Sequence, residues 1–163
     1  MTLKTTRMDV WVAPIDDAPG GLARTLRAIA DMGADLDCVL ARREMTMKGK
    51  GVAFITPLHG KEQLDNADQI GLHRAGHIHT LKVEGEDHPG MGAEITRVIG
   101  ETGINLHGLT ATVLGRKFVC YASFDSVADL ERAEQAIHSL DHERFPRLRA
   151  AMRKAMRERT VTT

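Results

Sequence analysis

An internal repeat constrains the fold of this chain more than any other feature of its sequence. Residues 17–23 read DAPGGLA, and residues 87–93, which begin 70 positions later (87 minus 17), read DHPGMGA. Both copies combine an acidic residue with Pro and Gly, as expected of a tight turn that opens a helix. The segments around the two copies also match in kind and order. A match at constant offset indicates a duplicated structural unit.

Each turn follows a run of strand-forming residues and precedes an amphipathic run at helical spacing. In the first copy these runs are residues 8–13 and 22–32, and in the second they are residues 78–83 and 91–102. The strand of the second copy alternates between apolar and polar side chains. This alternation places Leu81 and Val83 in the core, and the same offset places Trp11 and Ala13 there in the first copy.

Further strands and helices follow each first helix in the same order. The predictions for both copies are a second strand (35–42 and 104–113), a third strand joined to it by a hairpin (52–57 and 118–124), and a second helix (61–69 and 127–140). Only the first copy shows a fourth strand, at residues 70–73. The order βαββαβ predicts an α+β protein of two ferredoxin-like modules, each an antiparallel sheet with both helices on one face.

The repeat also sets the predicted domain boundaries. We expect a first module over residues 7–76, a second over residues 77–141, and a basic amphipathic helix and tail over residues 142–163. Modules this small are marginally stable alone, so we expect them to pack on each other or on a second chain. We therefore expect a homodimer or a larger homo-oligomer.

Composition excludes several classes of protein. Lys and Arg together number 22, as do Asp and Glu, so no overall positive charge points toward nucleic acid. We expect neither a membrane span nor a signal peptide, because no sufficiently long apolar run is present. The cysteines Cys38 and Cys120 lie in strand-like runs without metal-ligand spacing, and we interpret them as buried thiols of a cytoplasmic protein.

The two turns resemble those of the ACT domain family. The resemblance rests on DAPG (17–20) and DHPG (87–90), each between a strand and an amphipathic helix, and on GADL (33–36) and GINL (103–106) after the helices. It extends over residues 8–140. One known two-ACT arrangement is the glycine cleavage system transcriptional repressor. The resemblance implies a non-catalytic regulatory protein that binds an amino acid or another small metabolite where two ACT domains lie side by side.

The resemblance also implies where the ligand is held. Backbone N–H groups at a helix N-terminus can bind a carboxylate, and glycines allow a ligand to approach the backbone closely. The implied ligand-binding residues are Asp17, Pro19, Gly20, Gly21, Leu22, Asp35, Asp87, His88, Gly90, Met91, Gly92, Asn105 and Leu106.

Two composite sites follow if the modules pair side by side. One joins the Asp17 turn to Asn105, and the other joins the Asp87 turn to Asp35. We favour the first, because two carboxylates would face each other in the second. Both turns carry an acidic residue where the family has an amide, which puts the family's usual serine-type ligand in doubt.

A second reading remains open. An Asp-x-Pro-Gly turn can be purely structural, with its carboxylate capping the helix. The chain would then be an assembly or interaction module without a ligand, or a transcriptional co-regulator that acts through a partner protein. We predict no enzyme, no catalytic residue and no cofactor, because we find no catalytic motif.

Two other clusters are interpreted as non-functional. His73, His77 and His79 cluster in the sequence, and His77 and His79 would project to the same strand face as a conceivable metal pair. No cysteine or carboxylate ligand is nearby, and we predict no metal site. The arginines of residues 144–159 could contact RNA or an acidic partner. The apolar stripe in the same segment favours packing on protein, so we do not expect nucleic-acid binding.

Overall fold

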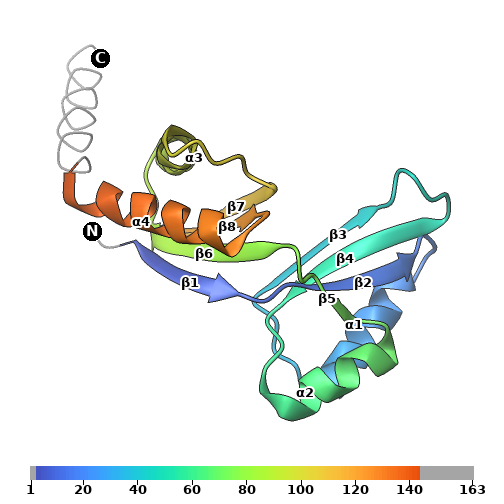
Figure 1. The fold of residues 1–163 in the computed structure, drawn as a ribbon. Coiled ribbons are helices and arrows are strands. Elements are labelled where there is room, and N and C mark those ends of the chain that lie inside the picture. The colour runs from blue at the N-terminus through green and yellow to red at the C-terminus, as the bar shows by residue number, and fades with distance from the viewer. Residues whose placement is uncertain (1–2, 144–163) are drawn as a thin grey trace, which may run out of the picture. The chain divides into compact units, whose positions relative to one another are not determined.

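The computed structural model describes residues 3–143, which form two compact modules, each with its own four-stranded sheet (Figure 1). The first module comprises residues 7–80. The second combines residues 3–6 with residues 81–143. The predicted α+β architecture of two ferredoxin-like modules is therefore confirmed.

The first module has the strand order β3-β4-β2-β5. Its elements in chain order are β2 (Trp11–Asp16), α1 (Gly21–Asp31), β3 (Cys38–Arg43), β4 (Lys50–Thr56), α2 (Gly60–Ala67), the 3-10 helix η1 (Asp68–Ile70) and β5 (His73–Arg74). As predicted, Trp11 and Ala13 face the core, where they pack with Ile29 of α1 and Ala67 of α2. Both helices therefore cover the same face of this sheet.

The second module has the strand order β1-β6-β8-β7. Its elements are β1 (Lys4–Met8), β6 (His79–Glu86), α3 (Met91–Glu101), β7 (Gly108–Leu114), β8 (Lys117–Phe124) and α4 (Val127–Glu143). The alternating residues Leu81 and Val83 are fully buried, as predicted, against Ile95 of α3 and Ile137 of α4.

Strand β1 gives the second module its missing fourth strand. It lies beside β6 at the sheet edge, the place that β5 takes beside β2 in the first module. The first module is thus inserted between two neighbouring strands of the second. Leu3 anchors this arrangement, because its side chain is 3% exposed within the second core.

The prediction of a strand over residues 8–13 is wrong in its bounds. Met8 ends β1 in one sheet, and β2 of the other sheet begins at Trp11. Strand-forming residues continue through this change of sheet, so the local pattern does not mark it.

The second strand of each module begins three or four residues later than predicted, at Cys38 and Gly108. Pairing with the neighbouring strand starts at the N–H groups of Asp37, which donates to Thr56 (3.0 Å), and His107, which donates to Ser123 (2.8 Å). The residues before Asp37 and His107 have side chains typical of strands, but their backbone groups do not pair with the neighbouring strand.

Cys38 differs from its prediction as a buried thiol. It is half-buried because β3 is an edge strand, whereas Cys120 of the inner strand β8 is buried as predicted. The predicted basic helix and tail, residues 142–163, lies outside the described residues except for 142 and 143, which end α4. No helix in the part of the chain that the structure describes is both long and apolar enough to cross a bilayer.

Candidate functional site

The two Asp-x-Pro-Gly turns have the same backbone conformation. Gly20 and Gly90 precede their helices with φ values of 82° and 91°, a left-handed conformation that glycine adopts without strain. Each turn is also held against the hairpin of its own module. The N–H group of Asp17 donates to Gly49 at 3.0 Å, and that of Asp87 donates to Arg116 at 2.7 Å.

Each turn leaves two backbone N–H groups open at the start of its helix. The first and fourth N–H groups of α1 donate to carbonyl oxygens of the turn, at 2.9 and 3.0 Å. Among the described residues, no acceptor takes those of Leu22 and Ala23. Helix α3 repeats this arrangement at 3.2 and 2.9 Å, with the N–H groups of Gly92 and Ala93 open. Such paired donors at the positive end of a helix favour an anionic group.

A pocket of about 220 Å³ lies beside the turn of the first module. The turn contributes Asp17, and α1 contributes Leu22, both of them predicted ligand-binding residues. The end of β3 contributes Arg42 and Arg43, which sequence analysis missed. The Nε of Arg43 donates to the Asp17 carboxylate at 2.9 Å. A guanidinium and a carboxylate therefore stand together beside the open helix N-terminus.

Two basic residues hold the neighbouring carboxylate of Asp16. The ammonium of Lys50 donates to it at 2.9 Å, and Arg24 approaches it at 3.4 Å. The hydrogen bond from Lys50 is the main cause that lowers the pKa of Asp16 from its usual value. Asp16 therefore stays negatively charged at neutral pH, and the pocket contains groups of both signs.

The second turn has different chemistry. Asp87 and His88 are half-buried, and the Nδ1 of His88 lies 3.2 Å from the carbonyl oxygen of Pro89. The position equivalent to Arg43, 70 residues later, is occupied by Val113, which is 48% exposed. The Asp17 carboxylate thus pairs with a guanidinium group, whereas the equivalent position of the second module carries an apolar side chain.

The other predicted polar residues lie away from the turns of their own modules. Asp35 and Asn105 are exposed and follow the C-termini of α1 and α3. Each helix has 11 residues, so at a rise of about 1.5 Å per residue a helix about 16 Å long lies between the turn and this polar residue. Within one module the structure brings Arg43, rather than Asp35, to Asp17.

Three predicted residues are apolar and contribute to the cores. Met91 is 1% exposed in the second core, Leu106 packs against the same core, and Leu22 packs against the first. Leu22 is the one of these that also lines the pocket of the first module. The remaining predicted residues, Pro19, Gly20, Gly21, Gly90 and Gly92, form the turns and the first helical residues.

From the sequence we interpret His73, His77 and His79 as surface residues rather than metal ligands. His73 lies 3.5 Å from the carboxylate of Asp68. Over residues 3–143, no group of three or more His, Cys, Asp or Glu side chains is placed to hold a metal ion.

Comparison with known proteins identifies the fold. No protein-family model matches the chain, and no curated protein matches it. Solved structures do match. The regulatory subunit of aspartate kinase from Thermus thermophilus in its ligand-free form has 16% identity and a TM-score of 0.58, over 83% of this chain and 97% of that chain. The chain has the fold of tandem ACT-domain proteins.

Two further solved structures are similar to this chain in fold. A structure of aspartokinase alpha and beta subunits has 20% identity and a TM-score of 0.60, over 88% of this chain and 99% of that chain. Protein BT0572 from Bacteroides thetaiotaomicron has 7% identity and a TM-score of 0.66, over 80% of this chain and 89% of that chain. The fold is shared at very low identity, so the site must be assigned from the residues of this chain.

Proposed function

We propose that this tandem ACT protein is a non-catalytic regulatory protein that binds an amino acid at the turn of its first module. The observation that carries the proposal is the Asp17–Arg43 ion pair beside the two open N–H groups of α1. An amino acid presents a carboxylate and an ammonium group, and this pocket offers a partner for each.

The ligand carboxylate would accept from the N–H groups of Leu22 and Ala23 and from the guanidinium of Arg43, which is 83% exposed and has donors to spare. The ligand ammonium would donate to the carboxylate of Asp17. Charge-assisted hydrogen bonds of this kind are the stronger ones. The polar side chains of the pocket are Asp16, Asp17, Arg42 and Arg43, and none of them is a hydroxyl, thiol or imidazole. This set favours recognition over covalent catalysis.

A neighbouring module would complete the site. Side-by-side pairing of modules would add Asn105 or Asp35 to a turn, as the resemblance to the ACT family implies. Ligand binding would then depend on assembly, which is how a small binding module regulates an attached or associated protein.

Titration of the full chain with each of the 20 amino acids tests this proposal by calorimetry and thermal shift. We expect one or a few to bind saturably and to raise the melting temperature, because a ligand that binds only the folded state stabilises it. Arg43→Gln should weaken that binding by about tenfold or more, the value of one charge-assisted hydrogen bond.

Arg27→Gln is the matched control. Arg27 is similarly exposed, at 79%, and it also pairs with one aspartate, Asp31, but it lies on α1 away from the pocket. Equal loss of binding in both variants, or no binding by any amino acid, would contradict the proposal.

A second candidate function is assembly without a ligand. Strands β3 and β7 are sheet edges, and both expose apolar side chains at equivalent positions, Val39 (38%) and Leu109 (42%). Exposed edge strands with apolar residues favour pairing with another chain. A partner could be a second copy of this protein or a protein through which it co-regulates transcription.

Lys substitution of both edge residues separates the two functions. The variant V39K/L109K should sediment as a smaller species than the unmodified chain if edge pairing drives assembly. Unchanged sedimentation of this folded variant would exclude assembly through these edges.

A further inference from the structure

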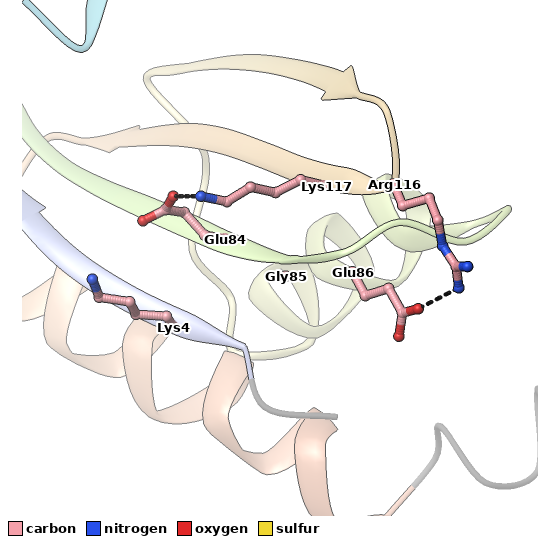
Figure 2. Close-up of a pocket in the computed structure, with 6 residues that line it drawn as sticks. All are labelled: Lys4, Glu84, Gly85, Glu86, Arg116 and Lys117. Atoms are coloured by element: carbon pink, nitrogen blue, oxygen red, sulfur yellow. Dashed lines mark hydrogen bonds and ion pairs between the residues drawn. The ribbon is translucent and has the colours of Figure 1, made fainter.

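A second pocket, of about 360 Å³, lies in the second module, on the strands that lead up to the Asp87 turn. It is lined by Lys4, Glu84, Gly85, Glu86, Arg116 and Lys117 (Figure 2). These residues come from three neighbouring strands of the sheet, β1, β6 and β8, and from the hairpin between β7 and β8. Its volume suits a small metabolite.

The alternation of the strands explains why these charges meet. Leu3, Val83 and Phe118 are buried in the core, so their neighbours Lys4, Glu84 and Lys117 project from the opposite face of the sheet. Both described helices of this module, α3 and α4, pack on the core side of the sheet.

Both carboxylates of the pocket are already paired. Glu84, whose side chain is only 12% exposed, accepts from Lys117 at 2.8 Å and lies 3.6 Å from Lys82. The hydrogen bond from Lys117 is the main cause that lowers the pKa of Glu84. Glu86 accepts from Arg116 at 2.7 Å, and Figure 2 shows these two pairs as separate dashed contacts.

The cationic groups keep donors to spare. Arg116 is 88% exposed and Lys117 is 60% exposed, and each pairs with one carboxylate oxygen through one of its several N–H donors. Over residues 3–143, no carboxylate forms an ion pair with Lys4. The charge of Lys4 helps to lower the pKa of Glu84, but only by attraction over a longer distance. Three cations against two paired carboxylates leave the lining with a net positive charge.

We propose that this pocket binds a compact dianion, either a phosphate group or a dicarboxylate, between the ammonium groups of Lys4 and Lys117, which both act on Glu84, while Arg116 adds positive charge at the hairpin end. Lys4 lies on β1 and Lys117 lies on β8, the two strands on either side of β6. A bound dianion would therefore hold β1 in the sheet, so that occupancy of the pocket would strengthen the attachment of the N-terminal strand to the second module.

Calorimetry of the full chain at fixed ionic strength tests the proposal, with inorganic phosphate, succinate and acetate as separate titrants. We expect saturable binding of phosphate or succinate and none of the monoanion acetate. Lys4→Gln should weaken dianion binding by about tenfold. The matched control is Lys61→Gln, since Lys61 is exposed on α2 of the other module and also has no ion pair within the described residues.

Hydrogen exchange provides a second readout. The bound dianion should slow amide exchange in β1 more than in β5, and Lys4→Gln should abolish that difference. Binding of phosphate alone would identify a phosphoryl ligand, and binding of succinate alone a diacid.

The proposal is overturned if neither dianion binds saturably, or if Lys4→Gln binds as tightly as Lys61→Gln does. Arg43→Gln, which disrupts the turn pocket of the first module, should leave dianion binding unchanged. Failure of this site and failure of the amino-acid site can therefore be distinguished.

Discussion

Gly21 begins α1 directly against the backbone of Asp16. A Cβ atom at this position would overlap the carbonyl oxygen of Asp16, a backbone atom that cannot rotate away. The equivalent residue of the second module is Met91, whose side chain fills the core. The repeated turn is therefore packed in two ways. In the first module Gly21 lies directly against the backbone, and in the second Met91 places its side chain in the core.

Gly21→Ala should destabilise the first module by about 1–3 kcal/mol, the range for inserting an atom into a packed site. Urea unfolding followed by the fluorescence of Trp11, the one tryptophan of the chain, measures this loss. Gly76→Ala is the control in the same module, since Gly76 is exposed and a Cβ there meets nothing within 4 Å, so it should change stability little. Equal stability of the two variants would contradict the close contact at Gly21.

The two cysteines should differ in reactivity. Burial raises the pKa of Cys120 to about 12, so its thiol stays protonated, and unreactive, at pH 8. Cys38 is half-buried on an edge strand. A thiol reagent at pH 8 should therefore label Cys38 first in the native protein, and Cys120 only on unfolding. Mass spectrometry of the labelled peptides measures this order, and early labelling of Cys120 would show that the second core opens readily.

At the scale of elements, β1 matters most, because it belongs to the second sheet although it precedes the first module. The second module has one further link to this strand. The hydroxyl of Thr5 donates to Glu134 of α4 at 3.0 Å and lies 2.9 Å from the Nε2 of His138. Together with buried Leu3, this link ties the N-terminus of the chain to its last described helix.

Leu3→Ala should destabilise the second module by about 2–4 kcal/mol, as expected for truncating a buried leucine. Near-ultraviolet circular dichroism of Tyr121, the one tyrosine, reports the unfolding of this module. Leu114→Ala is the control in the same module, because Leu114 is 80% exposed, and it should change stability little. An unchanged midpoint for Leu3→Ala would show that β1 contributes nothing to the second core.

At the scale of the whole molecule, the inserted topology makes the two modules unequal. The first module has all four of its strands within residues 7–80, whereas the second needs a strand from the other side of that insertion. We expect the fragment 7–80 to unfold cooperatively by itself and the fragment 81–163 to lack a cooperative transition. Adding a peptide of residues 1–8 should restore the transition. Cooperative unfolding of 81–163 alone would contradict this dependence.

The sequence by itself determined the repeat, the two turns, the order of most elements and the core-facing residues Trp11, Ala13, Leu81 and Val83. These features follow from periods of 2 and 3.6 residues and from the backbone needs of Pro and Gly, which are local properties.

Only the tertiary structure decided the sheet to which β1 belongs, the meeting of Arg43 with Asp17, and the cluster of Lys4 with Glu84 and Lys117. Each of these contacts joins residues far apart in the chain, and the smallest separation, between Asp17 and Arg43, is 26 positions. A periodic pattern shows which face of a strand is buried, but not which strand lies beside it. The pairing of distant strands depends on the cooperative packing of the whole core.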